Sequence, residues 1–212
     1  MNRRTLGRFA AAVLATGLMA GMLPLAHAAE EAPDAMIKRL SDEVLGTIRK
    51  DAAIQAGDIN KVMSLVDARI MPNVNFPRMT ASAVGPGWRQ ATPEQRQRLQ
   101  QEFKLLLVRT YSGALSQVSN EEVQMKPLRA QPTDTDVLVR SEIRGRGDPI
   151  QLEYRLEKTA EGWKIYNLNV LGVWLVETYR SQFTQEVNAK GIDGLIASLS
   201  ERNKANAAGK KG

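Results

Sequence analysis

The sequence contains no cysteine and a single histidine, His27, among its 212 residues. Without cysteine there is no disulfide framework, so burial of apolar side chains must stabilise the fold. The same scarcity excludes cysteine nucleophiles, ordinary zinc sites and a mature Ser-His-Asp triad if His27 is removed. The G-x-S-x-G, G-x-G-x-x-G and P-loop motifs are also missing. The chain therefore lacks the groups on which most enzymes depend.

The first 28 residues have the features of a secretory signal peptide. Arg3, Arg4 and Arg8 precede an apolar run at 9–25, and Ala26-His27-Ala28 has the small-x-small pattern of a cleavage site. Cleavage after Ala28 removes the only histidine and lowers the formal net charge from +6 to +3. A net charge this small does not favour nucleic acid as a partner. We expect the mature protein in the periplasm.

Long hydrophobic runs are missing from the rest of the chain. After position 28 no apolar run reaches the roughly 18 residues that a membrane span needs. A chain of this length usually forms one domain. We expect a signal peptide at 1–28, a single domain at 29–203 and a disordered basic tail at 204–212.

Several segments have the apolar periodicity of helices. The pattern predicts helices from Asp34 to about 56, from Asp58 to 70, from Thr92 to about 118, at 173–189 and from Asp193 onwards. Thr92 and Gln95 have the spacing of a capping box, with proline between them at the first helical position. The stretch between 72 and 91, rich in glycine and proline, is predicted to be looser.

Residues 123–171 change to the two-residue period of strands. Val137 and Val139 alternate with charged residues, as do Leu152, Tyr154 and Leu156. This predicts half-buried strands with one apolar and one charged face, in which Arg140 and Arg155 form cross-strand pairs with acids. Short connections, including a turn at 145–149, favour an antiparallel sheet of four strands, of which the fourth is central or bulged. Helices before and after such a sheet give an α+β fold.

The apolar face of this sheet needs a cover. We expect the helices that follow Thr92 and Gly172 to provide it, since both are rich in apolar and aromatic residues. A packed core explains these residues, and so does a pocket, because tyrosine and tryptophan suit a pocket with a wet mouth. Acidic pairs at Glu121-Glu122 and at 134 and 136 are the best candidates for a carboxylate hydrolase, but they fall in turns, where solvated acids are common.

Three segments, at 88–115, 162–183 and 190–199, resemble the MlaC family, also called the toluene-tolerance family. They read WRQATPEQRQRLQQEFKLLLVRTYSGAL, GWKIYNLNVLGVWLVETYRSQF and KGIDGLIASL. The resemblance implies a periplasmic phospholipid-binding shuttle with no enzymatic activity and no cofactor, whose cargo is glycerophospholipid. It also implies transfer between an outer-membrane lipoprotein complex and an inner-membrane ABC transporter with its substrate-binding ring, which maintains outer-membrane lipid asymmetry.

The family further implies a twisted sheet wrapped by helices, related to the nuclear-transport-factor-2-like (NTF2-like) cone, with an apolar cavity for the acyl chains. Strand alternation and the resemblance together give the following expected lipid-binding residues: Phe76, Met79, Leu106, Tyr111, Val139, Leu152, Tyr154, Trp174 and Tyr179.

Two alternatives to a lipid carrier remain open at this point. A periplasmic chaperone or adaptor would bind hydrophobic peptide segments in a surface groove and would expose a large apolar patch. A hydrolase that uses carboxylates alone would need two acids with opposed pKa shifts in one cleft.

Overall fold

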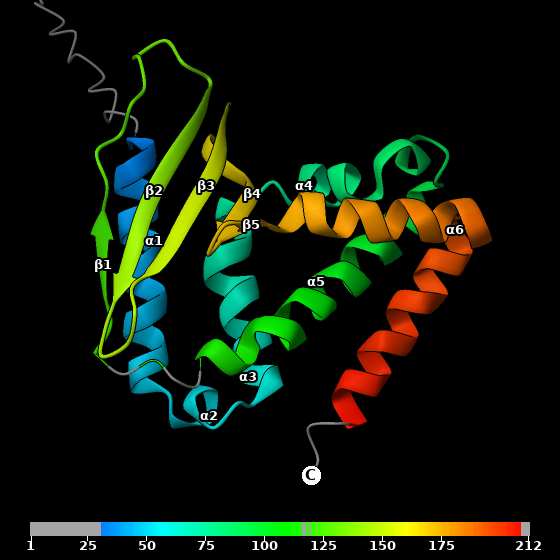
Figure 1. The fold of residues 1–212 in the computed structure, drawn as a ribbon, viewed down its shortest axis with the longest axis horizontal. Helices are drawn as coiled ribbons and strands as arrows, with labels where there is room; N and C mark the ends of the chain where they lie inside the picture. Colours follow the sequence, from blue (N-terminus) through cyan, green and yellow to red (C-terminus); the bar gives the residue numbers. More distant parts are fainter. Residues whose placement is uncertain (1–30, 116–117, 119, 209–212) are drawn as a thin grey trace, which may run out of the picture. The chain divides into compact units, whose positions relative to one another are not determined.

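The computed structural model describes residues 31–115, 118 and 120–208 (Figure 1). The expected signal peptide and its single histidine lie outside the described residues. The described part begins with helix α1, Pro33–Lys50, and the next helix, α2, is short, Ala52–Gln55. The sequence predicted one helix here. That prediction was wrong because the Asp51 side chain accepts hydrogen bonds from two backbone N–H groups of α2 and so starts a new helix.

The next helical segment begins at Asp58, as predicted. The Asp58 side chain accepts from the N–H groups of Asn60 and Lys61, and α3 runs from Ile59 to Leu65. The chain then continues as a π-helical turn, η1, Val66–Ile70, and a 3-10 turn, η2, Met71–Asn73. These turns deliver the chain to the edge of the sheet, where Val74 pairs with Ile165.

The stretch between 72 and 91 is more regular than the sequence suggested. Asn75 caps helix α4, Phe76–Val84, and a 3-10 turn, η3, Gly85–Arg89, follows. Pro77 lies at the start of α4, where a missing N–H costs nothing.

Helix α5, Pro93–Leu115, begins with the predicted capping box. The Thr92 N–H donates to Gln95 Oε1 at 2.9 Å, and the Gln95 N–H donates to Thr92 Oγ1 at 3.2 Å.

The sheet has five antiparallel strands in sequence order. They are β1 Glu122–Met125, β2 Asp136–Arg144, β3 Ile150–Thr159, β4 Gly162–Val170 and β5 Val173–Trp174. The predicted α+β class is confirmed, but the predicted count of four strands was wrong. The fifth strand is only two residues long and follows a tight turn, at a place where the sequence predicted the start of a helix. The predicted irregularity of the fourth strand is confirmed by a register shift opposite Arg155 and Leu156.

The last helix, α6, spans Leu175–Ala208 and consists of two limbs. Gly191 separates them with φ 70° and ψ −175°, a conformation essentially reserved for glycine. The two helices predicted at the end of the chain are therefore confirmed. The second limb reaches Ala208, so residues 204–208 are helical rather than part of a disordered tail; 209–212 lie outside the described residues.

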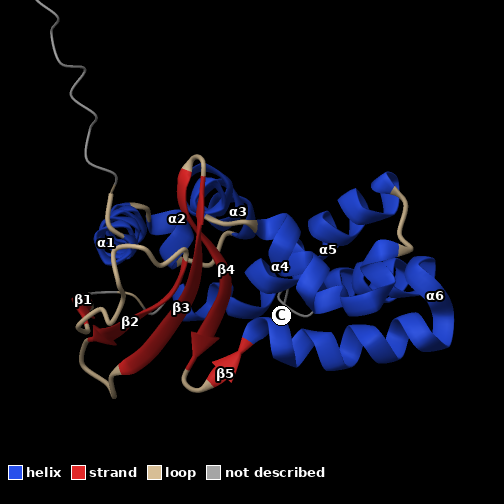
Figure 2. Cartoon of the chain, turned by 90° about the horizontal axis from the view of Figure 1, so that it is seen from above, coloured by secondary structure: helices blue, strands red, loops and turns tan. Residues whose placement is uncertain are grey.

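One face of the sheet is apolar, and α1 covers part of it. The cluster joins α1 to the inward-facing residues of β2, β3 and β4, namely Met36, Ile37, Leu40, Val137, Val139, Tyr154, Leu156 and Ile165. Figure 2 shows α1, α2 and α3 on this face, whereas α4, α5 and α6 lie beyond the β4–β5 edge. The expectation that α5 and α6 cover this face was therefore wrong. They bury their apolar residues against each other and against α4, and Val108 of α5 also packs against α1, α2 and α3.

The opposite face of the sheet is polar. The Arg140 Nε donates to Glu153 at 2.7 Å across β2 and β3, which confirms the predicted cross-strand pair. Arg155 instead pairs with Glu177 of α6 at 2.9 Å. Exposed pairs of this kind contribute about 1 kcal/mol or less each.

Removing an α1 side chain that packs on the sheet tests the role of this helix. We expect Ile37→Ala to lower the free energy of unfolding by about 2–5 kcal/mol, because Ile37 is 1% exposed within the cluster. Urea denaturation measures the change. The control is Lys38→Ala at the next, exposed position, for which we expect about 0.5 kcal/mol or less. Equal effects of the two substitutions would contradict a packed α1.

Glu142 gives the fold a dependence on acid. Its carboxylate accepts from Lys126 and Arg144, and these interactions lower the pKa of Glu142 from 4.5 to about 2. The depressed pKa contributes stability that is complete above pH 4.5 and is lost as the pH falls towards 2. We expect Glu142→Gln to be less stable at pH 7 and to lose less stability than the wild type between pH 4.5 and 2.

Urea midpoints measured across this pH range provide the comparison, with Glu122→Gln at an exposed position of β1 as the control. Parallel acid profiles for the wild type and Glu142→Gln would show that Glu142 does not carry the effect.

Candidate functional site

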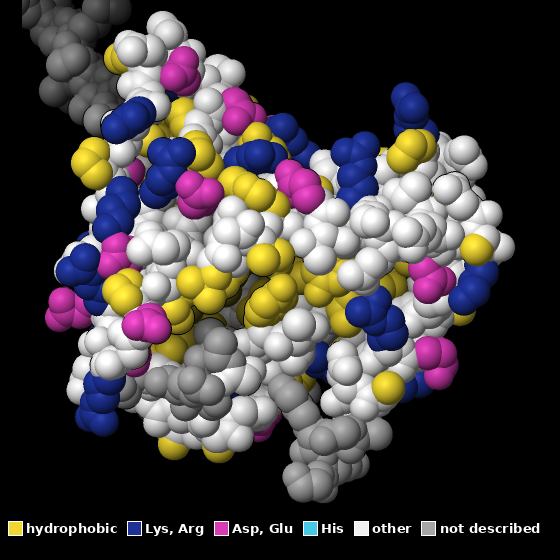
Figure 3. Space-filling view, viewed as in Figure 1, with side chains coloured by type: hydrophobic (Ala, Val, Ile, Leu, Met, Phe, Trp, Pro, Cys, Tyr) yellow, Lys and Arg dark blue, Asp and Glu magenta, His cyan; other side chains and the backbone are white. Residues whose placement is uncertain are grey.

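Figure 3 shows a hollow on the face of the molecule that Figure 1 views, with hydrophobic side chains gathered around it. Comparison of the two figures places the hollow between the β3–β4 part of the sheet, the α3–η1 segment and the C-terminal half of α5. The hollow therefore lies on the apolar side of the sheet, next to the strip that α1 covers.

The packing explains why space remains here. The buried apolar residues form three separate clusters among the described residues: one between α1 and the sheet, one among α4, α5 and α6, and one among α1, α2, α3 and α5. A small domain usually has one contiguous core. Here only partly buried residues, Val44 and Val74, are shared between clusters. The three clusters meet around a space that none of them fills.

The clusters leave a fringe of apolar side chains that are only partly covered. Those on the elements that border the hollow are Met63, Val66, Leu107, Leu152 and Leu168, whereas Val44 of α1 and Val74 each lie between two clusters. Apolar surface that is left uncovered at a concave site is free to contact an apolar ligand.

Three predicted site residues, Val139, Leu152 and Tyr154, lie on the apolar face of the sheet. Val139 is buried with the residues of α1, whereas Leu152 is partly buried. The Tyr154 hydroxyl lies 3.4 Å from Ser141 Oγ, and burial raises the pKa of Tyr154. Val139 and Tyr154 therefore contribute to the packing of this face of the sheet, whereas the Leu152 side chain retains uncovered surface.

Four other predicted residues come together in the helical cluster: Phe76, Met79, Leu106 and Tyr179. Phe103 lies at the centre of this cluster, with its ring centroid 5.8 Å from Phe76 and 5.0 Å from Tyr179, edge-on in the second case. These are favourable aromatic geometries. The cluster forms a rigid wall on the helical side.

The last two predicted residues differ in their positions. Tyr111 of α5 is 39% exposed, and burial and the neighbouring Tyr179 raise the pKa of its hydroxyl. Trp174 pairs with Asn169 on β4, and its ring lies beneath the Arg155 guanidinium at 4.2 Å. Arg155 belongs to the polar face of the sheet. The structure therefore does not bring Trp174 together with the other eight residues.

Sequence reasoning missed the contribution of α1 and α3. Val44, Met63 and Val66 are partly buried beside the hollow-bordering clusters, and none of them was a candidate. Their helical spacing was visible in the sequence. It showed that these helices have apolar faces but did not show which surface each face contacts.

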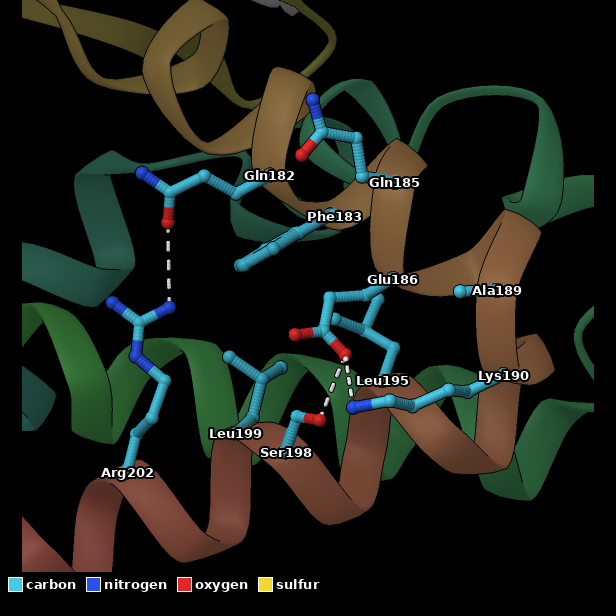
Figure 4. A pocket seen from close by; sticks show the side chains of 10 residues that line it. All are labelled: Gln182, Phe183, Gln185, Glu186, Ala189, Lys190, Leu195, Ser198, Leu199 and Arg202. Atoms are coloured by element: carbon cyan, nitrogen blue, oxygen red, sulfur yellow. Dashed lines mark hydrogen bonds and ion pairs between the residues drawn. The ribbon is translucent and has the colours of Figure 1, made fainter.

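A second hollow, of about 360 Å³, lies between the two limbs of α6 (Figure 4). Its apolar floor consists of Phe183, Leu195 and Leu199, which are already packed in the helical cluster. Its rim is polar: Glu186 accepts from the Ser198 hydroxyl at 2.8 Å and pairs with Lys190 at 3.4 Å. This crease offers little uncovered apolar surface, so we do not consider it the main site.

Within residues 31–115, 118 and 120–208, no group of three or more acidic or histidine side chains is placed to hold a metal ion. None of the helices in the same part of the chain combines the length and apolarity that a membrane crossing requires.

Comparisons with known proteins agree with one another. Residues 38–201 match the family model described as MlaC protein. The toluene tolerance protein ttg2D of Pseudomonas putida is 25% identical over 184 residues, which covers 85% of this chain and 86% of that protein. The intermembrane phospholipid transport system binding protein MlaC of Haemophilus influenzae is 24% identical over 177 residues, covering 82% and 83%.

A solved structure is more similar still. The phospholipid-binding protein of Ralstonia solanacearum, solved in complex with a phospholipid, is 47% identical to this chain. The two structures superpose with a TM-score of 0.80 over 82% of this chain and 98% of that one. The family match covers most of the chain and agrees with the fold and with the three segments noted in the sequence: this chain belongs to the MlaC family.

Proposed function

We propose that this protein binds a glycerophospholipid in the periplasm, with the acyl chains in the hollow between the sheet, α3–η1 and α5. The observation that carries the proposal is an apolar hollow bordered by three separate clusters. The phospholipid complex of the Ralstonia solanacearum protein, at 47% identity, supports it. Leu152 and Tyr111 are the proposed wall residues, with Val139, Tyr154, Phe76, Met79, Leu106 and Tyr179 packed behind or beside them.

The physical need for such a protein follows from the hydrophobic effect. A diacyl lipid has roughly 30 methylenes, and at ~0.8 kcal/mol each its exposure to water costs on the order of 20 kcal/mol. Free diffusion between two membranes is therefore negligible. A carrier has to offer apolar surface of similar quality and return the lipid without large loss. An open hollow with preformed walls meets both requirements, and no catalytic group is needed.

The proposed role extends to transport between membranes. We propose that the protein carries its lipid between an outer-membrane lipoprotein complex and an inner-membrane ABC transporter with its substrate-binding ring. Membership in the family and the phospholipid transport system named for the Haemophilus influenzae relative support this role. The acyl chains remain in the hollow during transit, and transfer takes place by contact with each partner.

Lipid extraction gives the first test. We expect the mature protein, purified from a bacterial periplasm without detergent, to release phospholipid at about one molecule or more per chain into organic solvent. Mass spectrometry of the extract identifies and counts the lipid. Protein that is folded and free of lipid would contradict the proposal, and co-purifying peptides in place of lipid would favour a chaperone.

A charged side chain on the sheet wall gives the second test. We expect Leu152→Glu to abolish lipid retention, because it places a carboxylate against the acyl chains. The matched control is Leu138→Glu on the neighbouring strand, since Leu138 is also partly buried but alternates to the polar face. Lipid per chain is measured for both variants after circular dichroism confirms folding. Equal retention would show that the apolar face of β3 is not the pocket wall.

A further inference from the structure

The segment formed by η1 and η2, residues 66–73, borders the hollow and contributes no residue to any of the three cores. We call this segment the strap. None of its residues is buried, whereas Leu65 before it and Phe76 after it are each 5% exposed. Val66 and Met71 pack only partly against the neighbouring clusters. A segment with few buried apolar contacts opens at a low cost in free energy.

Polar contacts join the strap to three different elements. Asp67 pairs with Lys104 of α5 at 2.7 Å, and Arg69 pairs with Glu43 of α1 at 3.9 Å. A carbonyl of η2 also accepts a hydrogen bond from Lys164 of β4 at 2.7 Å. The side chains of the two ion pairs are between 27% and 57% exposed. Ion pairs this exposed shift an equilibrium by about fivefold or less each, so they hold the strap weakly.

The backbone of the strap is irregular as well. Its first part is a π-helical turn and its second part a 3-10 turn. Both geometries occur in short pieces, and π-helical turns are frequent at functional sites. The other borders of the hollow belong to close-packed clusters and a hydrogen-bonded sheet, which resist deformation. Of the borders of the hollow, the strap is therefore the one that moves most easily.

We propose that the strap moves away from α5 and α1 to admit and release phospholipid, and that the Asp67–Lys104 and Arg69–Glu43 pairs close the hollow around the bound lipid. This inference rests on the proposed function, since it concerns passage into the same hollow. The two pairs belong to the closed state with or without lipid. They set how often the strap opens, so weaker pairs speed entry and release by the same factor and leave Kd unchanged.

The first test measures how fast a phospholipid enters and leaves the protein. Delipidated protein is mixed with a monomeric short-chain phospholipid that carries an environment-sensitive fluorophore on one acyl chain. Stopped-flow fluorescence follows uptake, and an excess of the unlabelled lipid then reveals release. Asp67→Asn and Arg69→Gln are compared with the wild type and with Asp42→Asn, which removes an exposed pair with Lys38 inside α1. We expect each strap variant to raise both rates by about twofold to fivefold at unchanged Kd, and the control to match the wild type.

A chemical lock provides the reverse experiment. Asp67→Cys and Lys104→Cys are introduced together and joined by a short bis-maleimide, which spans the place where the ion pair forms. The chain has no other cysteine, so only these two thiols react. The control is the same reagent on Lys38→Cys with Asp42→Cys, within α1. Because the locked strap cannot leave α5, we expect both rates to fall by about tenfold or more.

Thermal unfolding checks the fold of each protein. Faster exchange in the two strap variants together with slower exchange in the locked protein supports the inference. A locked protein that exchanges lipid as fast as its cross-linked control overturns the inference, and so do strap variants whose rates equal those of Asp42→Asn. In both cases the wild type still binds lipid, and the proposed function stands. A wild-type protein that takes up no lipid would refute both.

Discussion

The apolar face of the sheet is wider than the helix that packs on it. Helix α1 lies mainly against β1 and β2, whereas η2, α4 and α6 approach the sheet along β4. A short strip of the apolar face, at Leu152 of β3 and Leu168 of β4, is therefore left only partly covered between them. Apolar surface in such a place is costly in water, at about 25 cal/mol per Å². The arrangement of the remaining helices, and the ligand that we propose, both follow from this uncovered strip.

The helices around the strip cannot simply collapse onto it. The aromatic side chains of the helical cluster pack on one another around Phe103, and the third cluster joins the end of α1 to α3 and α5. Each cluster already buries its apolar side chains within itself, so moving it towards the sheet would bury little additional apolar surface. Protein interiors resist compression because they are close-packed. Three small cores, each packed independently of the others, thus keep the space open. Such a space suits a site that binds and releases its ligand repeatedly.

Local features of the fold were accessible from the sequence because they depend on near neighbours. The capping box at Thr92, the cap at Asp58 and the alternation of β2 and β3 each need only a few consecutive residues. Helix α4 was missed because the glycine and proline content of 72–91 indicated a looser stretch, although proline at the first turn starts a helix. Strand β5 was missed because two residues carry no period of their own.

The site was harder to predict than the elements. Tyr111 and Trp174 were chosen for the same reason, an amphipathic aromatic ring. They differ because the pairing of Trp174 with Asn169 turns its ring to the polar face. The surface against which α1 packs was equally hard to predict, because the apolar stripes of α1, α5 and α6 are alike in chemistry. Which stripe meets the sheet is decided by chain connectivity and by the β4–β5 turn, and neither is encoded in a local pattern.

The break at Gly191 determines where the second half of α6 packs. A continuous helix of the 34 residues of α6 would be a rod about 50 Å long, with its far half extending beyond the rest of the domain. The reversal at one glycine folds that half back, so that Leu195, Ile196 and Leu199 close the side of the aromatic cluster away from the sheet. A single glycine thus allows the second limb of α6 to pack on the outer side of the helical cluster. The side of that cluster that faces the hollow stays open.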